Sequence, residues 1–307
     1  MTGFSGFPSR MASATDGAKA ARSIPIDRLA IGTAAFFLTY GLGQALTDVF
    51  QTDTDSISSP YRPLVQGKIT KKQVFGVSMA GLTGCAAIFM VFNPWMLAPG
   101  IAGILGLILY TFFKRRWWSG PFWNSWIVAL LVLMGKMIQP MPFSAVWDRN
   151  LIFGMLSVFF SYAAFVLTGY LKDISADRQT DYQTIPVKFG WKPAIIISLV
   201  FTFLAFLFSS LILKRNGGFL PTPYPRVLIL MVWSAGIFFF VLAHVQLWTG
   251  KENEKKAYTG IGNVVRGFLL IHIAESLVFK PSFLLWGIGY YLLFEAVLFI
   301  RPEKSQV

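Results

Sequence analysis

The sequence predicts an all-α fold, a polytopic bundle of about nine transmembrane helices. Hydrophobic residues make up 55% of the 307-residue chain and charged residues only 13%, which is too apolar for a water-soluble domain. Apolar runs of about 18–25 residues, the length that crosses a bilayer, recur throughout the chain. Because the runs are continuous and do not alternate, they indicate helices rather than the strands of a β-barrel.

The predicted spans follow one another in a single series. In chain order they cover 28–47, 73–92, 95–113, 122–139, 151–171, 194–213, 227–248, 262–279 and 282–300. We expect one transmembrane domain over 27–301, because no second domain or low-complexity tract interrupts the series. Residues 1–26 are polar and lack the apolar core of a secretory signal peptide, so we expect a disordered tail. Its Ser, Ala and Arg content also overlaps that of organelle transit peptides.

Charge in the loops predicts the orientation of the bundle. The formal net charge is +13, but the basic residues lie in short loops between spans, which argues for a membrane protein and against a nucleic-acid partner. The loops after the first, third, fifth and seventh spans hold most of them: Arg62, Lys68, Lys71, Lys72, Lys114, Arg115, Arg116, Lys172, Arg178, Lys188, Lys192, Lys251, Lys255 and Lys256. By the positive-inside rule these loops face the cytoplasm. The basic residues of the N-terminal tail count against this orientation.

A cluster of acidic residues ends the first span, in the stretch TDVFQTDTDSISSPYRPLVQGKI at 47–69. Asp48 and Asp55 are two helical turns apart, which places them on one face if the segment is helical, with Gln51 between them. Asp53 adds a third carboxylate. Like charges so arranged destabilise a helix unless a cation lies between them.

A second acidic cluster follows the fifth span, in YLKDISADRQTDYQTIPVKFGW at 170–191. Asp173, Asp177 and Asp181 are spaced i, i+4 and i+8, so they align if this segment is helical. The loop charges place this cluster on the same, cytoplasmic face as the first one.

Carboxylates without nearby His or Cys indicate a hard cation, Mg²⁺ or Ca²⁺. Mg²⁺ commonly takes one or two carboxylates and completes its shell with water and phosphate oxygens, so two clusters suggest two metal ions around one polyanion. The candidate metal ligands are Asp48, Gln51, Asp53, Asp55, Asp173, Asp177 and Asp181. The candidate diphosphate-binding residues are Arg62, Lys114, Arg115, Lys172, Arg178 and Lys188. The alternative is that these charges belong to ordinary solvated loops.

These residues resemble the motifs of the UbiA superfamily of intramembrane prenyltransferases, over about 28–280. The first motif, N-D-x-x-D-x-x-x-D followed by P-x-R-P-L and S-G, is matched by Asp48, Asp55, Pro60, Arg62, Pro63 and Gly67. The second, D-x-x-x-D followed by T-x-P-V and F-G, is matched by Asp173, Asp177, Thr184, Pro186, Val187, Phe189 and Gly190. The third, Y-x-x-x-K-R, is matched by Tyr110, Lys114 and Arg115. The family includes 4-hydroxybenzoate polyprenyltransferases and chlorophyll synthases, and the Pro-Tyr-Arg-Pro form looks most like the latter.

The resemblance implies a Mg²⁺-dependent enzyme that moves a prenyl group from a polyprenyl diphosphate to a small or lipophilic acceptor, through an allylic carbocation. It leaves the acceptor and the prenyl length open. The catalytic residues that it implies are Asp48, Asp55, Asp173, Asp177, Lys114 and Tyr170. Aromatic side chains would shield the carbocation from water. We expect Tyr162 and Tyr170 in this pocket, and next Asn124 and Trp126.

Departures from the family pattern keep other functions open. Thr47 stands where the family has Asn, Gln51 replaces an aspartate, and Ala176 replaces a glycine. Loss of the Asn leaves a terpene cyclase, which acts on a prenyl diphosphate alone, as an alternative. A third candidate is a transporter, which would need Gly- or Pro-broken spans in matching halves.

Ionisable residues inside the spans are functional candidates by default. His272 and Glu275 are i, i+3 neighbours, and Glu295 and His244 also lie within predicted spans. Because they are far in sequence from the motifs, we expect His272 and Glu275 to form a structural pair.

Overall fold

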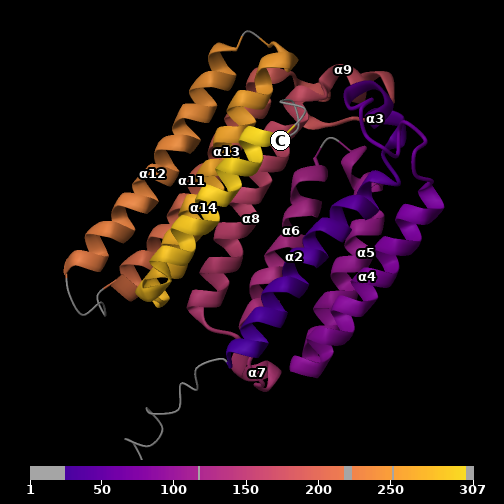
Figure 1. Cartoon of the computed structure of the whole chain (residues 1–307). Helices are drawn as coiled ribbons and strands as arrows, with labels where there is room; N and C mark the ends of the chain where they lie inside the picture. Colours follow the sequence, from indigo (N-terminus) through magenta and orange to yellow (C-terminus); the bar gives the residue numbers. More distant parts are fainter. Residues whose placement is uncertain (1–24, 117, 218–222, 251, 302–307) are drawn as a thin grey trace, which may run out of the picture.

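Long helices that run side by side make up nearly all of the structure, a computed structural model (Figure 1). It describes residues 25–116, 118–217, 223–250 and 252–301. All but the last two residues of the tail predicted at 1–26 lie outside the described residues.

Nine long helices form the bundle in the described part of the chain. They are α2 (Ile26–Asp48), α4 (Lys71–Phe92), α5 (Leu97–Lys114), α6 (Gly120–Lys136), α8 (Arg149–Gly169), α11 (Trp191–Gly217), α12 (Pro223–Thr249), α13 (Glu254–Phe279) and α14 (Leu284–Ile300). Eight of the nine are long and apolar enough to cross a membrane, and the 17-residue α6 lies among them. The prediction of an all-α polytopic bundle is therefore confirmed.

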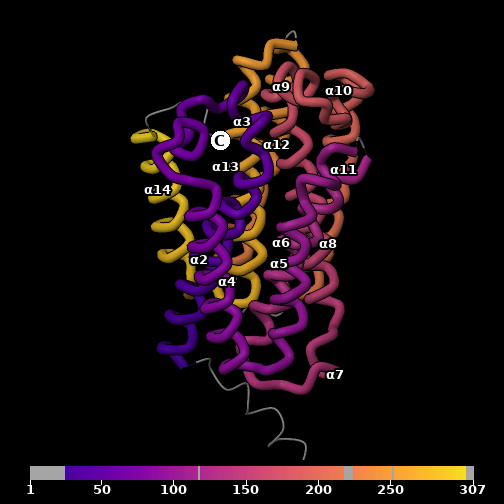
Figure 2. Tube along the Cα trace, turned by 90° about the vertical axis from the view of Figure 1, so that its right-hand side faces the viewer, coloured from indigo at the N-terminus to yellow at the C-terminus, as the bar shows by residue number. Residues whose placement is uncertain are grey.

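Short helices connect the long ones at both ends of the bundle. α3 (Thr52–Ser58), α9 (Ile174–Gln179) and α10 (Ile185–Phe189) lie at one end, which we call the motif end. α7 (Phe143–Val146) lies at the opposite end (Figures 1 and 2). Both acidic clusters therefore lie at the same end of the bundle, as the loop charges predict.

Neither acidic cluster lies on one continuous helix. α2 ends at Asp48, and α3 is a separate helix. After α8 the chain makes a 3-10 turn over Tyr170–Lys172 before α9 begins. Asp181 has a φ of 62°, a left-handed conformation that is uncommon outside glycine, and it follows the end of α9. The prediction that Asp173, Asp177 and Asp181 align on one helix is therefore wrong for Asp181.

Glycines let α12 and α13 approach closely. A Cβ at Gly267 of α13 would lie 2.9 Å from the carbonyl oxygen of Gly236 on α12 and would also meet the ring of Phe240. A Cβ at Gly260 would lie 3.2 Å from the carbonyl oxygen of Ala243. In a bilayer such close backbone packing is a main source of helix association, because the surrounding lipid is as apolar as the side chains.

The last helix, α14, lies on the outside of the bundle, and none of its described residues is buried. An ion pair connects it to α13: Arg266 Nε donates to Glu295 Oε1 at 2.6 Å and Arg266 Nη2 to Glu295 Oε2 at 2.8 Å. This two-pronged geometry is the strong form of an arginine–carboxylate pair. It gives Glu295 a structural partner inside the membrane.

We predict that Gly267→Ala destabilises the protein by about 1–3 kcal/mol, because the new methyl group overpacks the contact between α12 and α13. Gly289→Ala on α14 is the matched control, since its Cβ would meet nothing within 4 Å. Thermal unfolding in detergent measures both. Equal unfolding temperatures for the two variants would contradict the close packing described for Gly267.

Candidate active site

The two acidic segments come together at the motif end. Thr54 Oγ1 on α3 lies 2.8 Å from Thr180 Oγ1, which follows α9. The Tyr182 hydroxyl donates to Asp53 Oδ1 at 3.3 Å, and the Gln183 amide donates to the carbonyl of Arg115 at 2.8 Å. Segments more than a hundred residues apart are thus joined into one site.

Arg62 connects Asp48 and Asp55 of the first cluster. Its Nη1 atom lies 2.8 Å from Asp48 Oδ1 and 2.7 Å from Asp55 Oδ2. The two carboxylates therefore converge on one positively charged group, although they lie on different helices. Burial raises the pKa of Asp55 to about 6, against the lowering effect of Arg62. Burial by itself would lower the pKa of Arg62. The charges of Asp48 and Asp55 together outweigh this effect, so the pKa lies above its usual value.

Lys114, at the end of α5, connects the two clusters to each other. Its ammonium group donates to Gln51 Oε1 at 3.0 Å and lies 3.5 Å from Asp177 Oδ1. The Lys114 side chain is 6% exposed and that of Asp177 is fully buried. Asp177 Oδ2 accepts a hydrogen bond from Thr184, but Oδ1 accepts none from any described residue. Burial raises the pKa of Asp177 to about 6, with Lys114 opposing the change.

Tyrosine rings surround the Lys114 ammonium group, which lies 5.4 Å from the centre of the Tyr170 ring and 5.0 Å from that of Tyr182. The Tyr110 and Tyr170 hydroxyls are 3.1 Å apart and buried. A Cβ at Gly120 would lie 2.5 Å from the Tyr170 hydroxyl, so a side chain at the start of α6 would displace this hydroxyl. Tyr170 is thus beside the charged groups, as predicted.

Asp53 points away from the other acids. Its Oδ2 lies 2.7 Å from Arg115 Nη2, and both side chains are about two-fifths exposed, at 41% and 42%. The Arg115 guanidinium also lies over the Tyr182 ring, 4.3 Å from its centre. Asp53 and Arg115, predicted as metal ligand and phosphate ligand, therefore pair with each other at the surface.

The remaining predicted residues divide into two groups. Asp173 lies close enough to both clusters that its charge raises the pKa of Asp55 in the first and of Asp177 in the second. Lys172 is half-buried and lines a cavity with Asp48 and Asp55. The side chains of the other three, Arg178, Asp181 and Lys188, are exposed on α9, α10 and the loop between them. Among the described residues, no three His, Cys, Asp or Glu side chains are gathered at metal-binding distance.

A cavity of about 480 Å³ opens at the first cluster, and we call it the mouth. It is lined by the charged residues Asp48, Asp55, Arg62 and Lys172 and by apolar residues that include Leu298 of α14. The mouth therefore presents charged groups and apolar groups to the same space.

An apolar chamber of about 700 Å³ lies deeper in the bundle, between α2, α6, α8, α13 and α14. The end of the chamber nearest the mouth includes Tyr40, whose hydroxyl lies 3.4 Å from that of Tyr162. Tyr40 is eight residues before Asp48 on α2, which corresponds to about 12 Å along the helix axis. Phe37 also lines it and is 77% exposed, so the chamber opens sideways toward lipid. Tyr162 is in this lining, as predicted. Trp126 is not: its ring packs against Gly106 on α5.

Sequence reasoning missed most of the chamber, including the contributions of α2 and α14. Thr33, Phe36, Phe37 and Tyr40 are spaced i, i+3, i+4 and i+7, which is one face of a helix. This spacing was the available signal, but in an apolar span it does not distinguish a chamber wall from a surface that faces lipid or core.

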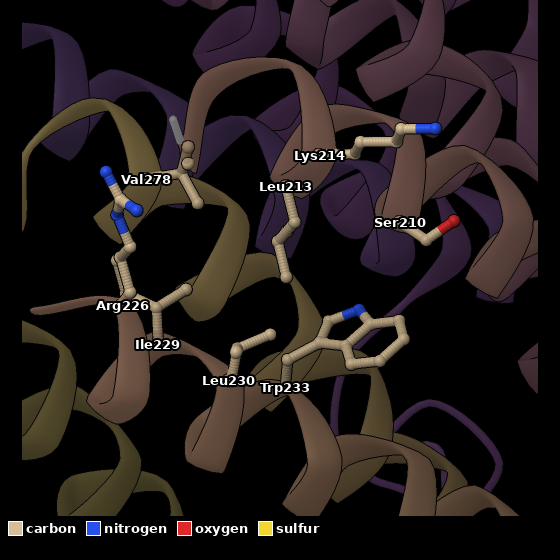
Figure 3. Close-up of a pocket in the computed structure, with 9 residues that line it drawn as sticks. Ser210, Leu213, Lys214, Arg226, Ile229, Leu230, Trp233 and Val278 are labelled. Atoms are coloured by element: carbon tan, nitrogen blue, oxygen red, sulfur yellow. The ribbon is translucent and has the colours of Figure 1, made fainter. Parts of the chain in front are cut away.

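A third hollow lies among α11, α12 and α13, away from the acidic clusters (Figure 3). Leu213, Ile229 and Trp233 face one another in it, and the charged ends of Lys214 and Arg226 point away from each other. Its lining contains no acid. It offers none of the oxygen ligands that the motif end provides.

Comparison with known proteins identifies the class. The chain matches the model of the UbiA prenyltransferase family over residues 11–269, and it therefore belongs to that family. It is a multi-pass integral membrane enzyme that transfers prenyl groups. The resemblance to the UbiA superfamily, read from the three motifs, is thus confirmed.

The relatives and a solved structure agree with this assignment. A digeranylgeranylglyceryl phosphate synthase of Methanosphaera stadtmanae is 24% identical over 245 residues, which cover 76% of this chain and 84% of the relative. One of Methanococcoides burtonii is 27% identical over 229 residues, or 73% and 76% of the two chains. The apo structure of a UbiA homolog from Aeropyrum pernix K1 superimposes with a TM-score of 0.68 at 17% identity, covering 83% of this chain and 90% of that one. This last likeness shows the fold.

We predict that Lys114→Met destabilises the protein by about 3–5 kcal/mol, because it leaves the Asp177 carboxylate buried without its partner. In Lys114→Met/Asp177→Asn both charges are absent, so most of this stability should return. Unfolding in detergent measures the two variants beside Asp177→Asn alone. Stability losses that simply add would mean that Lys114 and Asp177 do not interact.

Proposed function

We propose that this enzyme moves a prenyl group from an allylic diphosphate to a lipid-soluble acceptor, through an allylic carbocation and with Mg²⁺ at the acidic clusters. The observation that carries the proposal is the sequence of cavities, a charged mouth next to an apolar chamber of about 700 Å³. An allylic diphosphate has the same two parts, a highly charged head and an apolar tail.

Three observations support a fit to Mg²⁺. The ligands on offer are all oxygen atoms, which Mg²⁺ prefers. Asp48 and Asp55 already converge on one cationic nitrogen of Arg62. Asp177 Oδ1 is buried and accepts no hydrogen bond within the described residues, with the Lys114 ammonium group 3.5 Å away. Asp48 and Asp55 would hold one ion, and Asp173 and Asp177 a second. Bound there, Mg²⁺ would neutralise the charge that develops on the departing diphosphate.

The chain's own basic residues bind and orient the head group in this proposal. Arg62, which pairs with Asp48 and Asp55 in this structure, would pair with phosphate oxygens, for which its planar donors are suited. Lys114 remains between the two clusters and faces the head from within the bundle. Its position is fixed by Gln51, so we assign Gln51 to holding Lys114 rather than to the metal.

Aromatic groups protect the carbocation after the diphosphate leaves. Tyr40 and Tyr162 lie at the start of the chamber, and Tyr170 lies beside Lys114. Aromatic faces attract a cation by about 0.5–2 kcal/mol each, and the apolar lining excludes water that would otherwise quench it. The loop charges lead us to place this end of the bundle on the cytoplasmic side.

The relatives suggest the class of acceptor. Their product, digeranylgeranylglyceryl phosphate, carries two prenyl chains on one glyceryl phosphate. We therefore infer an acceptor that is a glyceryl phosphate with one prenyl chain already attached. Its free hydroxyl would attack the carbocation, and the hydroxyl proton would leave to solvent at the mouth.

We predict that Asp55→Asn lowers kcat/KM by about 10²-fold or more, since it removes a carboxylate that faces the mouth. Asp53→Asn is the matched control, two residues away on the same short helix, and should change kcat/KM by less than about tenfold. Release of diphosphate from geranylgeranyl diphosphate at varied Mg²⁺ measures both. Equal losses in the two variants would contradict the assignment of Asp55 to the metal.

We predict that product formation requires both substrates. Enzyme in lipid nanodiscs with geranylgeranyl diphosphate and a prenylated glyceryl phosphate should give a two-chain ether, identified by mass spectrometry. The single-substrate control contains the diphosphate alone and should give no product above the no-enzyme blank. A cyclic hydrocarbon or alcohol in that control would instead support the terpene cyclase, and solute flux without diphosphate release would support a transporter.

A further inference from the structure

The end of the apolar chamber that is farthest from the mouth is formed by one residue from each of four helices. α2 and α8 end at the motif end, whereas α6 and α13 begin there. The lining residues most distant from the motif end are Thr33 on α2, Val158 on α8, Val132 on α6 and His272 on α13. Three of these four side chains are small or aliphatic, and His272 is the only ionisable one of the four.

A separate cavity of about 480 Å³ begins on the other side of this chamber end. Its lining is polar at the side away from the chamber, where Lys136 and Asp148 form an ion pair. Val132, Val158 and His272 line both cavities. These three side chains are therefore the partition between the chamber and the polar cavity, and we call them the floor.

Hydrogen bonds hold the imidazole of His272 across this partition. Its Nδ1 lies 2.8 Å from Glu275 Oε2, and its Nε2 lies 3.0 Å from Ser161 Oγ. The Ser161 hydroxyl also donates to the carbonyl of Ser157 at 2.7 Å, which ties it to its own helix. Glu275 accepts a second hydrogen bond from the Ser157 hydroxyl at 2.6 Å. Both ring nitrogens are engaged, and the ring also packs edge-on against Phe268, with 4.5 Å between ring centres.

We propose that His272 sets the longest prenyl chain that the chamber accepts. The inference rests on the proposed prenyl transfer. A chain that fits within the chamber meets only apolar and aromatic walls. A longer chain that stays inside the chamber reaches the floor and has to displace the imidazole, which removes a hydrogen-bond partner of the buried Glu275. The floor thus opposes longer chains both by its volume and by its hydrogen bonds.

A purely structural role for the pair predicts a different result. His272 and Glu275 connect α13 to α8 through Ser157 and Ser161. If they only stabilised this contact, their replacement would lower stability and would lower activity alike for every chain length. The length profile of the substrates therefore separates the two roles.

The test compares two double variants that differ only in whether the floor is filled. His272→Ala/Glu275→Gln removes the ring and the unpartnered charge, and it joins the chamber to the polar cavity. His272→Phe/Glu275→Gln removes the same charges but keeps a ring of similar size in the floor. The full chain in lipid nanodiscs is assayed with geranyl, farnesyl, geranylgeranyl and geranylfarnesyl diphosphates, each with the same acceptor.

We expect the Ala variant to raise kcat/KM for the longest accepted chain by about tenfold relative to the shortest. One additional apolar group accommodated in a pocket typically changes kcat/KM by at least this factor. The Phe variant should keep the wild-type profile. Val132→Phe fills the floor from α6 and should lose the longest substrates first, which keeps the proposal testable if the Ala variant fails to fold. Identical length profiles in all variants would overturn the floor while prenyl transfer stands. Absence of transfer by the wild type with every diphosphate would overturn the proposed function and the floor together.

Discussion

The site depends on one buried ammonium group, that of Lys114. A lysine charge is stable inside a bundle only if a partner compensates for its lost hydration, and here Asp177 from the second motif does so while Gln51 from the first accepts its hydrogen bond. Lys114 itself belongs to the third motif, at the end of α5. One charge therefore ties together three segments that are distant in sequence.

The free enzyme holds its carboxylates with arginine and lysine rather than leaving them apart. Arg62 joins Asp48 and Asp55, which would otherwise repel each other in a half-buried site. This arrangement keeps the two carboxylates, our proposed metal ligands, close together. In the proposed reaction, metal and diphosphate would enter as an exchange of ion pairs, in which the arginine would lose two carboxylates and gain phosphate oxygens. Such an exchange needs little movement of the backbone, because the helices already place the partners.

The motif residues were predictable from the sequence because two kinds of local signal agree. Carboxylates at the ends of spans show that the site lies at a membrane surface. The charge of the loops shows which span ends lie at the same membrane surface, so Asp48 and Asp173 could be placed together. The pairing within the site was not predictable, since it depends on breaks in the backbone. The turn before α3 directs Asp53 outward to Arg115, and the left-handed conformation of Asp181 removes it from α9. The chamber was hidden for another reason, because apolar residues at helical spacing serve equally as lipid-facing surface, core and chamber wall.

The sideways opening at Phe37 changes what binding means for the prenyl tail. A tail that slides in from the bilayer leaves hydrocarbon rather than water, so the hydrophobic effect contributes little to its transfer. Affinity must come from the charged head and from the fit of the tail to the walls. The relevant concentration of substrate is its mole fraction in the surrounding lipid. Dilution with added phospholipid at constant bulk concentration should therefore slow this enzyme, as it would any catalyst whose solvent is the membrane.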